Sequence, residues 1–293
     1  MKKLYGTGVA LVTPFTESLE VDFKALKRLL QHTAKGVDYY VVMGTTGEAA
    51  TCSEEEKKAV LEFVKENNPN NLPIVYGIGG NNTQHLIDSI NSTDFDGVTA
   101  LLSVSPYYSK PSQEGIIRHF TVIADQSPVP VILYNIPSRT SSNLTAETTL
   151  RLAAHPNIIG TKEASGNLEQ CMRISKNMPK DFLLISGDDM QTVAMYAIGG
   201  KGVISVLANA YPKVFTKIKE FAFAGNYSKA SQQLYKLLEI NSPMYAEGNP
   251  VGVKYLLEVL GVCKSAVRLP LVEASGELQG AITRLAADIK NKG

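Results

Sequence analysis

Short runs of apolar and β-branched residues alternate along the chain with longer amphipathic stretches. The short runs predict eight strands, at Gly8–Val12, Tyr39–Met43, Ile74–Ile78, Val98–Leu102, Val129–Tyr134, Ile158–Lys162, Leu183–Ser186 and Val203–Ser205. The longer stretches repeat their apolar positions at helical spacing and predict helices, among them Phe23–Ala34, Glu54–Glu66, Thr83–Asn91, Gly115–Ala124 and Thr192–Ala197. Strands that alternate with helices of this length favour parallel β–α–β units.

Several helix starts are marked by their own residues. Ser53-Glu54-Glu55-Glu56 has the pattern of a capping box, and Ser112 and Thr145 stand where further helices begin. The amino-acid composition does not change between these eight β–α units. Eight such units in succession favour a closed (β/α)8 TIM barrel over an open sheet. No Gly-rich dinucleotide motif follows the first strand, which argues against a nucleotide-binding fold of the doubly wound kind.

After the eighth strand the pattern is helical only. The expected helices are Pro212–Ala222, Ser228–Glu239, Pro250–Leu260 and Leu278–Ile289. We therefore expect a catalytic barrel over residues 1–224 and a C-terminal helical extension over residues 225–293. No low-complexity linker separates the two parts.

Lys162 lies at the end of the sixth predicted strand, and barrels of this kind carry their active sites at the C-terminal strand ends. If Ile158 and Gly160 face the barrel interior, the period of two places Lys162 there as well. Burial lowers the pKa of a lysine, and a neutral amine can attack a carbonyl to form an imine. The position is also compatible with a surface lysine beyond the strand, or with one paired to Glu163, and most lysines are exposed.

Other predicted strand ends supply groups that suit the same chemistry. The hydroxyl of Tyr134 can relay protons, and the planar fork of Arg139 suits a carboxylate. The segment Gly44–Glu48, which includes Thr45 and Thr46, can aim backbone N–H groups at an anion without being a phosphate-binding P-loop. Taken singly, each feature also fits a core tyrosine, a solvated arginine and an ordinary turn.

Composition excludes several other classes of function. The chain has 293 residues, 44% of them hydrophobic, and 29 basic against 28 acidic residues leave a net charge of +1. This balance gives no drive towards nucleic acid or an anionic membrane. No apolar run approaches the ~20 residues of a membrane span, and no signal core is present, so we expect a cytoplasmic protein. The cysteines Cys52, Cys171 and Cys263 and the four histidines show no disulfide or metal-site spacing.

Together these segments resemble the pyruvate-dependent Schiff-base lyase family, which includes the dihydrodipicolinate synthases and the N-acetylneuraminate lyases. The resemblance runs from Gly6 to about Leu271 and is carried by five segments in order: Gly44–Glu48, Tyr134–Thr140, Gly160–Gly166, Ser186–Asp189 and Gly202–Val206. Within the family, Tyr-Asn-x-Pro-x-Arg-Thr at Tyr134–Thr140 looks like the dihydrodipicolinate synthases, because sugar acid lyases usually lack the arginine. The segment Ser105-Pro106-Tyr107-Tyr108 is similar to the same group.

The resemblance implies that pyruvate, held as a Schiff base, condenses with L-aspartate 4-semialdehyde to give 4-hydroxy-tetrahydrodipicolinate in diaminopimelate and lysine biosynthesis. The implied catalytic residues are Lys162, Tyr134, Thr45 and Tyr108, the last from a neighbouring subunit. The implied substrate-binding residues are Thr46 for the pyruvate carboxylate, Arg139 for the second substrate, and Gly187 and Ile204 around the pyruvate. No metal or organic cofactor is implied, and the assembly would be a homotetramer built as a dimer of dimers.

Many members of the family are inhibited by lysine at a site between subunits. The corresponding segment here offers Ala50, Asn81, His85 and Tyr107 as a candidate allosteric set. Glu54, Lys57 and His85 stand where sensitive members often carry histidines and a glutamate, so we expect weak or absent feedback. Gly252 also departs from the family pattern, within the helical extension. Two alternatives stay open: an aldolase for N-acetylneuraminate or a keto-deoxy sugar acid, and a non-catalytic barrel that senses a keto acid.

Overall fold

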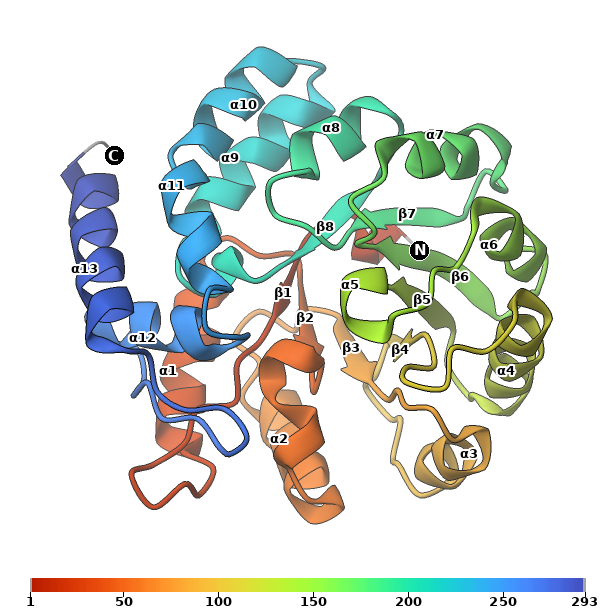
Figure 1. The fold of residues 1–293 in the computed structure, drawn as a ribbon, viewed down its shortest axis with the longest axis horizontal. Coiled ribbons are helices and arrows are strands. Elements are labelled where there is room, and N and C mark those ends of the chain that lie inside the picture. Colours follow the sequence, from red (N-terminus) through yellow and green to blue (C-terminus); the bar gives the residue numbers. More distant parts are fainter. Residues whose placement is uncertain (1, 292–293) are drawn as a thin grey trace. The chain divides into compact units, whose positions relative to one another are not determined.

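Eight parallel strands form a closed barrel in the order β1 to β8 (Figure 1). The computed structural model describes residues 2–291. The strands are β1 (Gly6–Ala10), β2 (Tyr39–Val42), β3 (Ile74–Gly77), β4 (Ala100–Val104), β5 (Val131–Asn135), β6 (Ile158–Glu163), β7 (Leu183–Ser186) and β8 (Gly202–Ser205). The TIM-barrel prediction is confirmed.

Helices connect the strands and continue beyond the last one. Those of the barrel are α1 (Phe23–Thr33), α2 (Glu54–Glu66), α3 (Thr83–Asn91), α4 (Gln113–Gln126), α5 (Pro137–Thr140), α6 (Ala146–Leu152), α7 (Leu168–Asn177), α8 (Thr192–Ala197) and α9 (Pro212–Phe223). The C-terminal helices are α10 (Tyr227–Tyr235), α11 (Leu238–Asn241), α12 (Val251–Val259) and α13 (Gly276–Asn291). The domain boundary at residue 224 stays a prediction.

The observed elements differ from the expected ones in three respects. Strands β1 and β4 are shifted by two residues, which keeps the same side chains on each face because the strand period is two. The four-residue helix α5 was not expected. The stretch Ser228–Glu239 was predicted as one helix, and this is wrong, because the chain turns at Lys236 and Leu237 and divides it into α10 and α11.

The predicted helix starts are present as hydrogen-bonded caps. The Ser53 hydroxyl accepts from the Glu56 N–H at 3.2 Å, and the Glu56 carboxylate accepts from the Ser53 N–H at 2.9 Å. This is the reciprocal capping box, and it uses N–H groups that a helix start leaves unbonded. Ser112 and Thr145 cap α4 and α6 through their side-chain oxygens, which accept from the Gly115 and Thr148 N–H groups.

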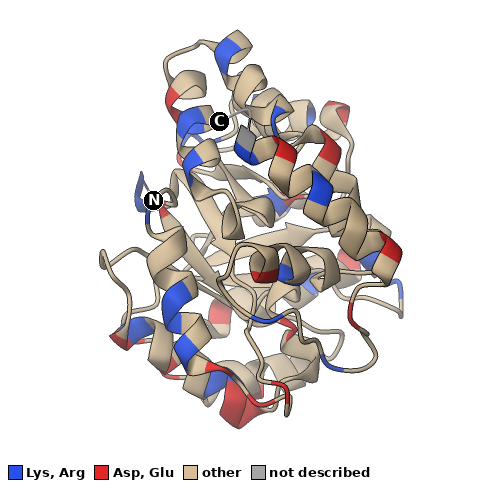
Figure 2. Ribbon diagram, turned by 90° about the vertical axis from the view of Figure 1, so that its left-hand side faces the viewer, with Lys and Arg blue, Asp and Glu red and all other residues tan. Residues whose placement is uncertain are grey.

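The described chain forms two compact units. One contains the residues up to Gly6 together with Pro73–Ile204, and the other contains Thr7–Leu72 together with the chain from Ser205 onward. Figure 2 shows basic and acidic positions on the same helices, in line with the balanced net charge. Within residues 2–291 no helix is long and apolar enough to cross a membrane.

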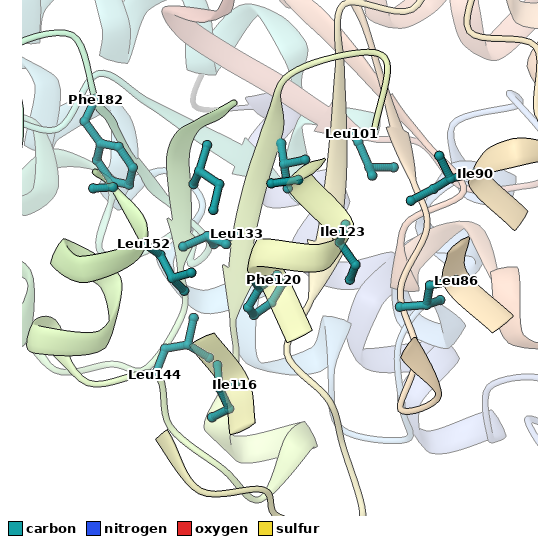
Figure 3. Packing of buried hydrophobic residues seen from close by; sticks show 14 residues of the cluster. Leu86, Ile90, Leu101, Ile116, Phe120, Ile123, Leu133, Leu144, Leu152 and Phe182 are labelled. Carbon is teal, nitrogen blue, oxygen red and sulfur yellow. The ribbon is translucent and has the colours of Figure 1, made fainter. Parts of the chain in front are cut away.

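The first unit has a hydrophobic cluster between its strands and its outer helices (Figure 3). Phe120 and Ile123 of α4 pack with Leu133 of β5, and all three are fully buried. Because side chains alternate along a strand, the burial of Leu133 against the helices turns Ile132 and Tyr134 to the opposite face. That face is the barrel interior, so packing outside the barrel determines where the Tyr134 phenol points.

In the second unit, α12 packs closely against the turn before it. A Cβ atom at Gly252 would lie 2.6 Å from the Pro243 carbonyl oxygen and 2.6 Å from the Met244 Cα. Backbone atoms cannot move aside as the end of a flexible side chain can, so this position requires glycine. The departure from the family pattern at Gly252 therefore has a packing reason within the helical extension.

Candidate active site

Lys162 and Tyr134 are paired neighbours on strands β6 and β5. The Lys162 side chain is only 7% exposed, and its Nζ lies 4.0 Å from the centroid of the Tyr134 ring. The face of an aromatic ring attracts an ammonium and also shields it from water. A register shift between Ile158 and Gly160 turns Ile158 to the outer helices, where it packs with Val131, so its expected inward orientation is wrong. Beyond the shift, Gly160 and Lys162 pair with Ile132 and Tyr134, and the parallel register brings the amine and the phenol together.

The environment of Lys162 favours the neutral amine. Burial lowers the pKa of Lys162 to about 7; the Asp189 carboxylate opposes this shift, and the Arg139 guanidinium adds to it. An ordinary lysine has a pKa near 10.4, so at neutral pH only a very small fraction of it is nucleophilic. At a pKa of about 7, about half of the Lys162 side chains are neutral at neutral pH and able to attack a carbonyl.

The rate of imine formation is expected to follow this pKa. Below pH 7 the rate at fixed pyruvate should rise about tenfold per pH unit, because only the deprotonated amine attacks, and above pH 8 it should level off. The measurement is the rate of borohydride-dependent inactivation across the pH range, with circular dichroism to show that the fold is retained. A rate that still climbs above pH 9 would mean an ordinary lysine pKa.

Glu163, the next residue after Lys162, is buried, and its carboxylate forms hydrogen bonds with other side chains and with the backbone. Its carboxylate accepts from Asn135 Nδ2 at 3.0 and 3.1 Å, from Gln170 Nε2 at 3.1 Å and from the Ser165 N–H at 2.7 Å. Successive strand residues point to opposite faces, which explains why adjacent side chains have separate partners. The network ties the end of β6 to β5 and α7. Sequence reasoning gave no role to Asn135 or Gln170.

Gly187, directly after β7, lies against the Lys162 side chain. A Cβ atom at this position would lie 3.2 Å from both Cγ and Cε of Lys162 and 2.6 Å from the Ala164 Cβ. The Gly187 N–H donates to the Glu163 carbonyl at 2.8 Å, so its backbone cannot easily withdraw. Ile204, on the following strand β8, is also buried. Because Gly187 has no side chain, it leaves space beside the Lys162 side chain.

Thr46 and Thr45 stand in a 3₁₀ turn, Thr45–Gly47, that follows β2. Thr46 is buried and Thr45 is exposed. The turn uses the N–H groups of Gly47 and Glu48, which donate to the Gly44 and Thr45 carbonyls at 3.0 and 3.1 Å. The N–H groups of Thr45 and Thr46 come earlier in the turn and donate neither of these two hydrogen bonds. This is the arrangement in which a turn can present donors to an anion.

Arg139 stands on α5, whose last turn it occupies. Its side chain is exposed, and its charge contributes to the lowered pKa of Lys162. Pro137 is pre-organised for the first position of the short helix, which accounts for a helix at this point. The arginine is therefore carried on an ordered turn within the same unit as the lysine.

The loop after β4 leaves Tyr108 89% exposed, with a positive φ of 71°. The preceding carbonyl, of Tyr107, accepts from Asn81 Nδ2 at 3.3 Å, which connects the loops after β4 and β3. His85 on α3 is exposed, as is Ala50. Of the candidate allosteric residues, the structure brings together Asn81 and Tyr107.

Metal ligands and reactive thiols are the other kinds of site that titratable side chains can form. Among residues 2–291 no group of three or more His, Cys, Asp or Glu side chains could hold a metal ion. Cys52, Cys171 and Cys263 are buried, unbridged thiols. Burial raises the pKa of Cys171 and of Cys263 to about 12, so neither is a reactive thiolate at neutral pH.

A parallel barrel that buries an amine beside a phenol at adjacent strand ends is typical of lyases that act through a lysine. The model of the dihydrodipicolinate synthetase family matches residues 3–289. The chain belongs to this family, as the resemblance predicted, and is a lyase-type synthase.

Individual relatives are similar to this chain over nearly its whole length. A 4-hydroxy-tetrahydrodipicolinate synthase of Cytophaga hutchinsonii is 52% identical over 279 residues, which are 95% of this chain and 94% of that protein. The solved dihydrodipicolinate synthase of Thermotoga maritima is 32% identical, with a TM-score of 0.94 over 98% of each chain. A structure described as the first monomeric dihydrodipicolinate synthase variant has a TM-score of 0.95 at 32% identity, covering 98% and 97% of the two chains.

Proposed function

We propose that this chain condenses pyruvate with L-aspartate 4-semialdehyde to give 4-hydroxy-tetrahydrodipicolinate, in the diaminopimelate route to lysine. The observation that carries the proposal is the buried amine of Lys162, with its pKa lowered to about 7, beside Tyr134. Such an amine is a carbonyl nucleophile at neutral pH. The names of the relatives, at up to 52% identity, support the choice of substrates.

The proposed reaction begins when Lys162 Nζ attacks the keto carbon of pyruvate. The carbinolamine then loses water, and Tyr134, Thr45 and Tyr108 relay the protons that this step requires, Tyr108 coming from a neighbouring subunit. Loss of a methyl proton converts the imine to an enamine, whose carbon attacks the aldehyde of the second substrate, and the resulting alkoxide takes up a proton. The amine of the second substrate then attacks the iminium carbon, which closes the ring and releases the Lys162 amine. The iminium supplies the electron sink, so we propose no metal and no organic cofactor.

The proposed binding groups divide between the two substrates. Thr46, through its hydroxyl and backbone N–H, binds the pyruvate carboxylate, and Gly187 and Ile204 line the space around its methyl group. Arg139 binds the carboxylate of aspartate semialdehyde, since a guanidinium can hold a carboxylate through two parallel hydrogen bonds. The exposure of Arg139 suits a substrate that enters after pyruvate has already reacted.

The experiment that tests this function is borohydride trapping with pyruvate, mapped by mass spectrometry. We expect one reduced adduct, on the peptide that contains Lys162, and loss of the adduct in favour of product when aspartate semialdehyde is added first. Pyruvate trapping without turnover of aspartate semialdehyde would point to a different aldolase of the family. An adduct on another lysine would contradict the mechanism.

Replacement of Arg139 by alanine is expected to separate the two substrates. The KM for aspartate semialdehyde should rise by about tenfold to a hundredfold, the effect of removing a charge-assisted contact, while pyruvate trapping persists. Steady-state kinetics with each substrate varied in turn measures both effects. Arg284→Ala, at an exposed position on α13, is the matched control. Loss of trapping with normal use of aspartate semialdehyde would refute this role.

We propose a homotetramer, a dimer of dimers, in the cytoplasm. The exposed Tyr108 in a positive-φ loop supports a subunit contact there, because tyrosine suits interfaces that are part apolar and part wet. Three buried, unbridged thiols support a reducing compartment. The proposed partners are the two substrates and other copies of this chain, with neither nucleic acid nor membrane.

Added lysine is expected to inhibit little or not at all. The Lys57 ammonium lies 2.8 Å from the Glu54 carboxylate, so this acidic group already has a cation as its partner. The exposed His85 offers an imidazole where an acidic residue would bind the ammonium of lysine. Initial rates measured at increasing lysine concentration test this expectation, and strong inhibition at low concentration would contradict it.

A further inference from the structure

The loop after β2, which carries Thr46, is bonded to the C-terminal helical segment of the second unit. Three side chains from that segment contact the loop: Asn249 just before α12, Lys254 on α12, and Arg268 between α12 and α13. They lie about two hundred positions further along the chain than the loop. The catalytic and binding residues proposed above all precede the helical extension in the chain.

Asn249 contacts Thr46 directly. Its Nδ2 donates to the Thr46 Oγ1 at 3.1 Å. An amide nitrogen is only a donor, so the threonine oxygen is the acceptor in this bond and its own hydrogen is left for another acceptor. A hydroxyl held in this way is a ready donor to an anion. The orientation that carboxylate binding needs is thus set by a residue outside the strand ends.

Glu48, two residues after Thr46, is held by the Lys254 side chain and by the backbone of Arg268. It has a left-handed backbone, with φ at 53°, which residues other than glycine rarely adopt. The Lys254 Nζ lies 2.5 Å from its Oε1, and the Arg268 N–H donates to its Oε2 at 3.1 Å. Both carboxylate oxygens are therefore bound to the extension, which keeps the turn in its left-handed form.

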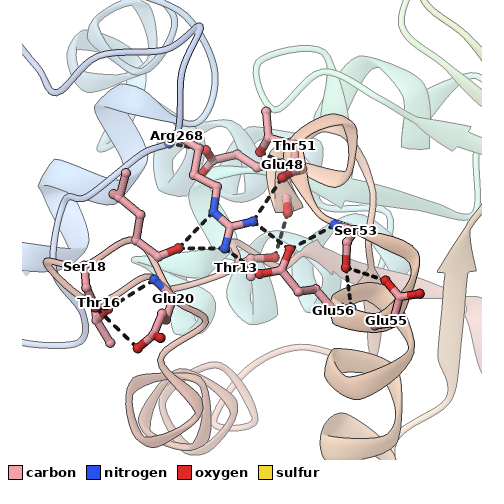
Figure 4. Close-up of polar contacts among 12 residues, drawn as sticks. Thr13, Thr16, Ser18, Glu20, Glu48, Thr51, Ser53, Glu55, Glu56 and Arg268 are labelled. Carbon is pink, nitrogen blue, oxygen red and sulfur yellow. Dashed lines mark hydrogen bonds and ion pairs between the residues drawn. The ribbon is translucent and has the colours of Figure 1, made fainter.

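Arg268 is itself firmly anchored (Figure 4). Its guanidinium donates to both oxygens of Glu56 at 2.5 and 2.7 Å and to the Thr51 carbonyl at 3.0 Å. It also lies 4.3 Å from the centroid of the Phe15 ring, and Lys254 lies 4.0 Å from the same centroid. A bidentate pair fixes direction as well as distance. The extension therefore contacts the turn through a rigid cluster.

We propose that Asn249 is a positioning residue for recognition of the substrate carboxylate, with the Lys254–Glu48–Arg268 cluster holding the turn that presents Thr46. The proposal rests on the function proposed above for Thr46. It gives the C-terminal helical segment a part in substrate binding. If Asn249 served packing alone, its replacement would alter stability and leave ligand preference unchanged.

The test compares pyruvate with acetone, which has the carbonyl group without the carboxylate. The variant is Asn249→Asp, which keeps the shape and turns the donor into an acceptor, so that the Thr46 hydrogen points to it and away from the anion. Borohydride trapping at Lys162 is followed as a function of ligand concentration. Asn226→Asp, at the N-cap of α10, is the matched control, since aspartate caps a helix as well as asparagine does.

We expect half-saturation by pyruvate to rise about tenfold or more, while acetone trapping and the KM for aspartate semialdehyde stay within about twofold of the unaltered protein. Asn249→Ala should give the same selective loss to a smaller extent. Equal losses for both ligands, or no loss for pyruvate, would overturn the proposal. If the unaltered protein itself fails to trap pyruvate at Lys162, the proposed function fails instead. Should Asn249→Asp not fold, the comparison rests on Asn249→Ala. Equal losses of pyruvate and acetone trapping in that variant, relative to the unaltered protein, would contradict the proposal.

Discussion

A protein with Lys162 replaced by alanine is expected to form no reducible adduct with pyruvate and to turn over at least about 10³-fold more slowly. The reason is local, because Lys162 carries the buried amine that the Tyr134 ring covers, and its pKa is lowered to about 7. A loss of 10³ corresponds to about 4 kcal/mol of transition-state stabilisation. Mass spectrometry after borohydride treatment and a steady-state assay measure the two effects.

Lys180→Ala provides the matched control for this prediction. Lys180 is exposed, and its replacement should leave both trapping and turnover unchanged. Circular dichroism of the Lys162→Ala protein, compared with that of the unaltered protein, shows whether the fold is retained. An adduct that survives in Lys162→Ala would mean that the nucleophile is another residue.

Lys254→Met is expected to lower the free energy of unfolding by about 3–5 kcal/mol. The Lys254 side chain is fully buried, and its Nζ donates to the Ala266 carbonyl at 2.7 Å besides contacting Glu48. Burial lowers the pKa of Lys254, and the Glu48 carboxylate opposes that shift. Methionine fills a similar volume, so the expected loss comes from leaving the Glu48 charge buried with less compensation.

Urea denaturation of the single and double variants measures this effect. Lys254→Met combined with Glu48→Gln removes both charges and should recover part of the loss, because the stranded carboxylate is gone. Lys217→Met, at an exposed position on α9, controls for the change of residue type. A loss below about 1 kcal/mol for Lys254→Met would show that the buried pair contributes no more than a surface one.

Much of the barrel could be predicted because each β–α segment carries its own hydrophobic period and its own helix-capping residues. Ser53 and Glu56 are three residues apart and form their capping box within one turn, so the prediction needed no tertiary information. The strand errors at β1 and β4 were shifts of two residues, which preserve the inward face. Helix α5 was missed because four residues are too few for a periodic pattern.

The candidate site was predictable in its residues and much less so in its contacts. Lys162 and Tyr134 were identified by their places at strand ends, and the parallel register then made them neighbours. The bonds of Glu163 to Asn135 and Gln170 were not foreseen, since they join three elements through polar side chains that carry no periodicity. Position alone could not distinguish this arrangement from a Lys162–Glu163 pair.

By itself the sequence determined the order of strands and helices, the inward face of regular strands such as β5, and the residues at the C-terminal ends of the strands. These follow from periods of 2 and 3.6 and from caps a few residues long, which operate within each segment. Only the tertiary structure decided the pKa of Lys162 and the connection of Asn249, Lys254 and Arg268 to the Thr46 turn. Burial and charge depend on neighbours that are distant along the chain, so they arise only when the chain is folded.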